Sequence, residues 1–214
     1  MTSNIKLQIR ISILFLCLVV SSVSLAQRAT NKWKAQVAIG LNYPISDGFV
    51  EPFYGKSVNF PTVNLGIQHM FKKEFGAKLD FGFNRFVNGD EIPDFKINYT
   101  RLNAQFVYDP TNKLHFLPAK MGVVAHGGPG LSFVKPLGTL GENKQTFLNA
   151  MIGGEIHYGL TQTLSVYIDG SYIYGFTSPG DYDDPIEGLG AFNGSLLTVT
   201  FGITFSLSGC QYCD

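Results

Sequence analysis

The sequence predicts an all-β protein, an eight-stranded antiparallel up-and-down transmembrane β-barrel. Three observations predict this fold. Eight segments alternate apolar residues with small or polar ones, and the connections between them alternate between short and long. Charged residues make up only 15% of the chain, whereas soluble domains average about a quarter. The low charge indicates a surface that is not wholly in water.

The N-terminal segment has the pattern of a cleaved secretory signal. Lys6 and Arg10 precede a short apolar run, and the run ends in small residues at Ser24 and Ala26, as signal peptidase requires. The alternative is an uncleaved anchor, but the apolar run is too short to span a membrane stably. We therefore expect residues 1–26 to be a signal peptide and residues 27–32 to be a short lead-in.

The remaining chain has the length of one domain and is nearly neutral. The whole sequence has 16 basic and 16 acidic residues, so neither sign provides the strong field that collects nucleic acid. No later segment approaches 18 uninterrupted apolar residues, which excludes a helical membrane protein.

The predicted strands are defined by a period of two, which puts apolar and polar side chains on opposite faces of a sheet. No stretch shows a persuasive helical period of 3.6 residues. We expect strands at residues 33–43, 62–71, 75–86, 96–108, 119–134, 146–160, 164–176 and 196–207.

The alternation is visible in most of these segments in turn. The first contains VAIGLN, the second TVNLGI, the third KLDFGFN and the fourth RLNAQF. The sixth contains GGEIHY and the seventh VYIDGSYIY. The last is the most regular, because every odd position of LTVTFGITFSL is apolar and every even one is small or polar.

The connections indicate an up-and-down meander. Residues 72–74 and 161–163 are tight turns, and the link at 109–118 is longer than a tight turn. The other four connections are long and rich in Gly, Pro, Asp and Asn. Short turns at one end and long loops at the other are typical of an up-and-down barrel.

The bulk of the apolar face indicates that it points outward. The lumen of an eight-stranded barrel is filled by about a dozen side chains. The apolar face of the predicted strands carries far more bulky residues than that. A soluble two-sheet sandwich holds more of them, so volume alone does not remove that alternative. The last strand, at about 3.3 Å per residue and a tilt near 40°, rises about 28 Å, close to the lipid-facing band of such barrels.

The positions of the charged residues agree with this orientation. Arg85 and His69 share the apolar parity but lie near strand ends, where aromatic residues also gather, as at a membrane–water boundary. The other strand charges share the polar parity and predict a luminal charge network, interpreted as a packed polar plug, with a gated pore as the alternative. The network residues are Lys34, Lys78, Asp80, Arg101, Glu155 and Asp169.

The pattern from residue 33 to residue 207 resembles the small outer-membrane β-barrels of Gram-negative bacteria, the OmpA-like and OmpX-like group within the porin family. The barrel-assembly signal of that group is matched by Thr200, Gly202, Phe205 and Leu207, although the group usually ends on an aromatic residue. Only a short tail, residues 208–214, follows, so the peptidoglycan-binding domain of OmpA proteins is not carried over.

The resemblance implies an outer-membrane location with both termini, including the lead-in and the tail, in the periplasm and the long loops outside the cell. It also implies contact with outer-membrane lipid and lipopolysaccharide, and with the barrel-assembly machinery during biogenesis. Subunits of a larger envelope complex are further possible partners, because a small barrel without a soluble domain often serves as a subunit.

We expect no catalytic residues, no cofactor and no metal. Barrel lipid A deacylases use a His-x-Ser pair, and none of the four histidines is followed by one. Cys210 and Cys213 form a C-x-x-C interpreted as a tail disulfide or idle thiols. The acidic run from Asp181 to Glu187 is interpreted as a solvated loop, with a Ca²⁺ site as the alternative.

The sequence therefore predicts a non-enzymatic outer-membrane protein with a structural, surface-recognition or complex-subunit role. A narrow, porin-like channel for small solutes is the alternative, and a lipid-modifying enzyme is a more distant one.

Overall fold

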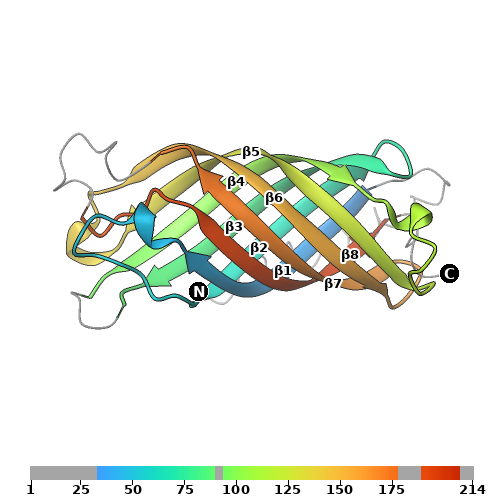
Figure 1. Ribbon diagram of the computed structural model, residues 1–214, viewed down its shortest axis with the longest axis horizontal. Coiled ribbons are helices and arrows are strands. Elements are labelled where there is room, and N and C mark those ends of the chain that lie inside the picture. Colours follow the sequence, from blue (N-terminus) through green and yellow to red (C-terminus); the bar gives the residue numbers. More distant parts are fainter. Residues whose placement is uncertain (1–32, 90–93, 178–188, 208–214) are drawn as a thin grey trace, which may run out of the picture.

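The computed structural model describes residues 33–89, 94–177 and 189–207 (Figure 1). Within these ranges the chain forms eight antiparallel strands, each paired with its sequence neighbours, and the pairing of β1 with β8 closes the barrel. The predicted fold class is confirmed. The strands are β1 (Trp33–Pro44), β2 (Asn59–Met70), β3 (Phe75–Val87), β4 (Lys96–Tyr108), β5 (Met121–Pro136), β6 (Gln145–Gly159), β7 (Leu164–Gly175) and β8 (Leu196–Ser206).

The strand ends differ from the prediction by a few residues. β2 begins at Asn59, three residues before the predicted start, because Asn59 pairs with Asn42 across a register shift in β1. Pro61 lies in this extra segment and has no N–H to donate, so the sequence there reads as a loop. β5 likewise continues to Pro136, which pairs with Ile97.

The β2–β3, β4–β5 and β6–β7 connections lie at one end of the barrel, which we call the short-connection end, and the start of β1 and the end of β8 lie there too. The Leu207 N–H donates to the Trp33 carbonyl oxygen (3.1 Å), which brings the last described residue to the first. The β4–β5 link is compact despite its length, because its short 3-10 helix η2 (Thr111–Lys113) is tied to β5. The Thr111 hydroxyl accepts from the Val123 N–H and donates to the Val123 carbonyl oxygen.

The opposite end, which we call the long-loop end, carries the other four connections, of which β1–β2 and β7–β8 are the longest. Two of them contain further short 3-10 helices, η1 (Ser46–Gly48) and η3 (Gly138–Leu140). In the described ranges, none of the helices is long and apolar enough to cross a membrane.

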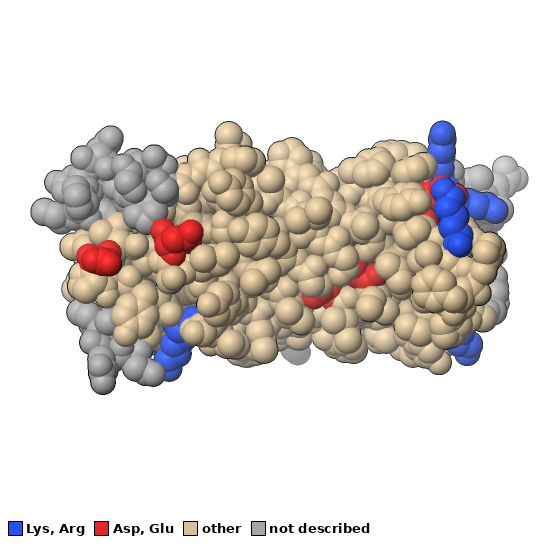
Figure 2. Space-filling view, in the orientation of Figure 1, with Lys and Arg blue, Asp and Glu red and all other residues tan. Residues whose placement is uncertain are grey.

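The apolar face of the wall points outward. In β8, Val199 and Phe201 are 58% and 54% exposed, whereas Thr200 between them is 1% exposed. Figure 2 shows only small acidic areas along the middle of the visible wall, most of the visible Lys and Arg at its right-hand end, and a further basic area toward its left-hand end. An apolar surface of this extent is far larger than a soluble monomer exposes, so the wall matches a lipid environment.

The described side chains in the lumen fall into three zones. At the long-loop end an apolar cluster contains Phe86, Tyr99 and Phe147. At the short-connection end a smaller apolar cluster consists of Met70, Val107 and Val124. Buried polar and charged side chains occupy the zone between them. The polar parity of the strands predicts the central zone but not the two apolar clusters.

A cationic side chain introduced into the wall should destabilise the barrel according to its depth. Phe201 lies at the middle of β8 and Phe205 lies one residue before its end. We expect Phe201→Arg to lower the free energy of unfolding in phospholipid vesicles by about 2–4 kcal/mol, because Arg at the bilayer midplane costs that much, and Phe205→Arg to lower it by about 1 kcal/mol or less. Denaturant titration measures both. Equal losses for the two variants would contradict a wall embedded in lipid.

Candidate functional site in the barrel lumen

The six residues of the predicted charge network are all buried inside the barrel, but they do not form one cluster. Two carboxylates, Glu155 and Asp169, lie close to a histidine in the centre. Asp80 and Arg101 form a separate pair, and Lys34 lies nearer the short-connection end, at the second position of β1.

Arg101 and Asp80 form an ion pair between neighbouring strands, β4 and β3. The guanidinium group also donates to the side-chain oxygens of Asn64 (3.1 Å) and Asn103 (3.2 Å). Gly82 makes room for it, since a Cβ at that position would lie 2.6 Å from Arg101 Nε. A fully buried guanidinium thus has one charged partner and two amide partners.

Glu155 is the hub of the central group. Its Oε1 accepts from the Lys78 ammonium at 2.7 Å, and its Oε2 accepts from Gln36 at 2.9 Å. His157 Nε2 lies 2.6 Å from the same Oε2. Because Glu155 is on β6, Lys78 on β3 and Gln36 on β1, these contacts cross the lumen rather than follow one wall.

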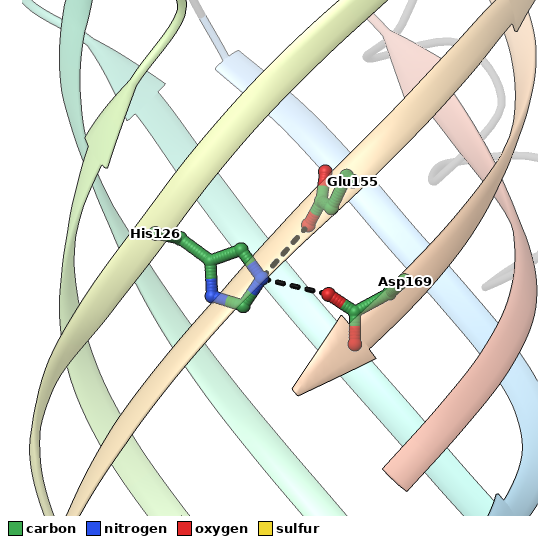
Figure 3. A group of neighbouring side chains, drawn as sticks. All are labelled: His126, Glu155 and Asp169. Carbon is green, nitrogen blue, oxygen red and sulfur yellow. Dashed lines mark hydrogen bonds and ion pairs between the residues drawn. The ribbon is translucent and has the colours of Figure 1, made fainter. Parts of the chain in front are cut away.

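Asp169 is the second centre, on β7. His126 Nε2 lies 2.7 Å from Oδ2 of Asp169, and the Ser171 hydroxyl donates to Oδ1 at 2.7 Å. The same His126 nitrogen is 4.0 Å from Oε1 of Glu155, so the imidazole points between the two carboxylates (Figure 3). Gly153 lies beside this ring, and a Cβ there would approach it to 2.7 Å.

Besides His157, which contacts Glu155, His126 is a central residue that the sequence analysis did not place in the network. It lies in the glycine-rich segment HGGPG of β5, where the apolar alternation is lost. The sequence does contain one signal that places His126 in the lumen. His126 lies two residues after the buried Val124, so the strand period of two puts both side chains on the same face.

The group around His126 does not match a nucleophilic catalytic site. A serine nucleophile needs a base within hydrogen-bond reach of its hydroxyl. Here Asp169 lies between Ser171 and His126 and accepts from both, and in the described ranges no hydrogen bond joins the two donors. All three side chains are buried. His157 does lie between the Ser165 hydroxyl (3.4 Å) and Glu155 (2.6 Å), but the first distance is longer than a general base needs and these three side chains are buried as well.

The same group has the donor types of a metal site but not its geometry or charge. His126, Glu155 and Asp169 each offer one ligand atom within 4.8 Å of the others, and imidazole with carboxylates suits Zn²⁺. However, His126 and Asp169 are 2.7 Å apart, whereas ligand atoms of a tetrahedral zinc site are separated by about 3.3 Å. The Glu155 oxygen that faces His126 already accepts from Lys78, so a dication would lie beside an ammonium group. The geometry favours a network of hydrogen-bonded ions.

The remaining predicted sites have different outcomes. Thr200 and Gly202 face the lumen from β8, Phe205 faces outward and Leu207 follows the strand, but their role as a barrel-assembly signal stays a prediction. The signal peptide, the lead-in, the acidic run, and Cys210 and Cys213 with the tail all lie outside the described residues.

Comparison with known proteins identifies the fold. No protein-family model matches the sequence, and no curated protein matches it. Among solved structures, neisserial surface protein A superposes with a TM-score of 0.55 and 11% identity, over 81% of this chain and 95% of that one. This chain has the fold of a small outer-membrane β-barrel.

Two further solved structures agree. The N-terminal β-barrel domain of OprF from Pseudomonas aeruginosa has a TM-score of 0.50 and 11% identity, over 82% of this chain and 97% of that domain. A major outer membrane protein from Thermus thermophilus has a TM-score of 0.51 and 14% identity, over 80% of this chain and 98% of that one. At these identities the likeness concerns the fold alone.

Substituting Lys78 alone should destabilise the barrel more than substituting Lys78 and Glu155 together. Lys78→Met leaves Glu155 buried without its ammonium partner, and breaking a buried pair costs about 3–5 kcal/mol. We expect that loss in the free energy of unfolding in vesicles, and a smaller loss for the double variant Lys78→Met/Glu155→Gln. Denaturant titration of the folded fraction measures both.

Lys113→Met is the matched control, because Lys113 pairs with Glu74 at 2.8 Å on the surface. Exposed ion pairs contribute little, so this variant should unfold almost as the unmodified protein does. The network interpretation is wrong if the control loses as much stability as Lys78→Met, or if the double variant loses as much as the single one.

Proposed function

We propose that this protein is a non-enzymatic barrel of the outer membrane, with both termini in the periplasm, whose long-loop end forms a recognition surface outside the cell. The observation that supports this role is the attachment of two long connections to the barrel mouth by buried aromatic side chains. A surface fixed in this way binds a partner with little ordering cost.

Phe49 and Phe192 are these attachments. Phe49 comes from the β1–β2 connection and is 6% exposed, and Phe192 comes from the β7–β8 connection and is fully buried. Their ring centroids are 4.8 Å apart. Phe192 also contacts Phe86 of β3 and Tyr99 of β4, with centroids at 5.1 and 6.1 Å.

The backbones of the two connections are joined as well. The Asn193 N–H donates to the Gly48 carbonyl oxygen (3.0 Å), and the Ile45 N–H donates to the Ser195 carbonyl oxygen (2.9 Å). The contact requires glycine, because a Cβ on Gly48 would lie 2.5 Å from the backbone of Gly194. The described parts of the first and last long connections therefore form one unit.

The side chains packed and bonded across the lumen favour this role over a solute channel. A conducting path needs a continuous water column, whereas here the apolar cluster around Phe192 adjoins a centre in which Glu155 is bonded to side chains from other strands. The predicted network residues, three carboxylates and three cationic side chains, are all buried in the lumen, so their charges offset one another in a region of low dielectric. Burial of the His126 group likewise gives no support to an enzymatic role.

Photo-crosslinking in intact cells tests the recognition surface. A photoreactive residue replaces Tyr54 or Val58, which are 43% and 60% exposed in the β1–β2 connection. We expect discrete crosslinked products from both positions. The Phe192→Ala background should give fewer of them, because Phe49 of the β1–β2 connection then loses its ring contact with Phe192 and is held less firmly at the barrel mouth.

Phe116, 80% exposed in the β4–β5 link at the opposite end, provides the control position. Products from Phe116 alone would refute recognition at the long-loop end. Steady unitary conductance of the unmodified protein in planar bilayers would support the channel instead.

A further inference from the structure

The outer wall of the barrel has a hollow near its short-connection end. It spans β1 to β4 and has a volume of about 630 Å³. Two small outward side chains, Ala77 of β3 and Ala104 of β4, interrupt the bulky wall there, and the larger side chains of Trp33, Phe71 and Phe106 surround them. We call this hollow the Ala77–Ala104 groove.

One side of the groove is built of contacting rings. Trp33 and His69 lie opposite each other in the β1–β2 register, with ring centroids 4.5 Å apart. His69 and Phe71 follow edge to face at 5.2 Å. On the other side, Phe106 is the register partner of Ala77. Because these rings support one another, the groove has a defined shape.

The turn beside the groove is positively charged. Lys72 and Lys73 directly follow Phe71 and are exposed, and in the part of the chain that the structure describes neither forms an ion pair. The neighbouring Glu74 does not offset them, because it is paired with Lys113. In Figure 2 most of the visible Lys and Arg lie at the right-hand end of the molecule, where the short-connection end is.

We propose that the Ala77–Ala104 groove holds an acyl chain of one anionic glycerophospholipid, whose phosphate group contacts Lys72 and Lys73. Association within a bilayer gains little from the hydrophobic effect and depends on close packing, so a flexible chain that fills a hollow is the occupant this shape favours. Cationic side chains at the membrane surface attract anionic headgroups. The groove supplies the packing and the turn supplies the charge.

This inference rests on the membrane location given under the proposed function but not on the recognition role. The groove and both lysines lie at the same end of the barrel. The choice of a glycerophospholipid also rests on the periplasmic location proposed for that end.

Native mass spectrometry of the full chain, released from detergent with equimolar phosphatidylglycerol and phosphatidylcholine, tests the lipid site. We expect one phosphatidylglycerol to be retained in preference to phosphatidylcholine. Lys72→Glu/Lys73→Glu should reduce this preference, by about fivefold for each lysine whose attraction is lost. Lys135→Glu/Lys144→Glu is the control, because it changes the net charge equally at exposed positions at the long-loop end.

A second pair of variants tests the groove itself. Ala104→Phe fills it and should abolish retention of the lipid, whereas Ala150→Phe, outward on β6 and away from the groove, should not. Equal retention of the two lipids, equal effects of the two charge variants, or full retention by Ala104→Phe would each overturn the proposal. A lipid-free dimer would assign the groove to a second copy of the chain.

Failure of the membrane location itself is detected separately. A protein that folds in buffer without detergent and does not insert into vesicles refutes that location and this lipid site with it. A protein that inserts but shows no lipid preference refutes the site alone.

Discussion

Each side chain of the barrel wall faces either lipid or the lumen, and its sequence neighbours face the other side. The organisation of the molecule depends on this constraint, because every side chain of a closed sheet must lie either outside the barrel or inside it. It places Val199 and Phe201 outside and Thr200 inside. Closure also sets the width of the lumen, and that width lets Lys78 and Gln36 reach Glu155 from opposite sides of the barrel.

The strands were predictable because their signal is local. A period of two needs only a few consecutive residues, so the segments are found even where Pro61 or Pro136 obscures an end. Parity also gives the side of the wall on which each charge lies. It does not give the partner, because the contact between Lys78 and Glu155 joins residues 77 positions apart across the lumen.

Two parts of the interior were beyond the sequence pattern for different reasons. His126 lies where glycines remove the bulky residues that mark the outward face. The apolar cluster at the barrel mouth includes Phe49 and Phe192, which come from connections that have no period. Together with the cluster at the other end, it encloses the polar centre between apolar side chains, and ion pairs are stronger in such a setting, although burying the ions remains costly.

The bond between Leu207 and Trp33 shows that the two ends of the barrel meet at one seam. Every other pair of neighbouring strands is joined directly by a connection, whereas β1 and β8 are paired only through hydrogen bonds. These contacts have the largest sequence separation in the fold, so forming them costs the most loop-closure entropy, and they raise the contact order. Formation of the β1–β8 pairing is therefore the step expected to limit the rate of folding. The same pairing is where the folded barrel can open with the least strain on its turns.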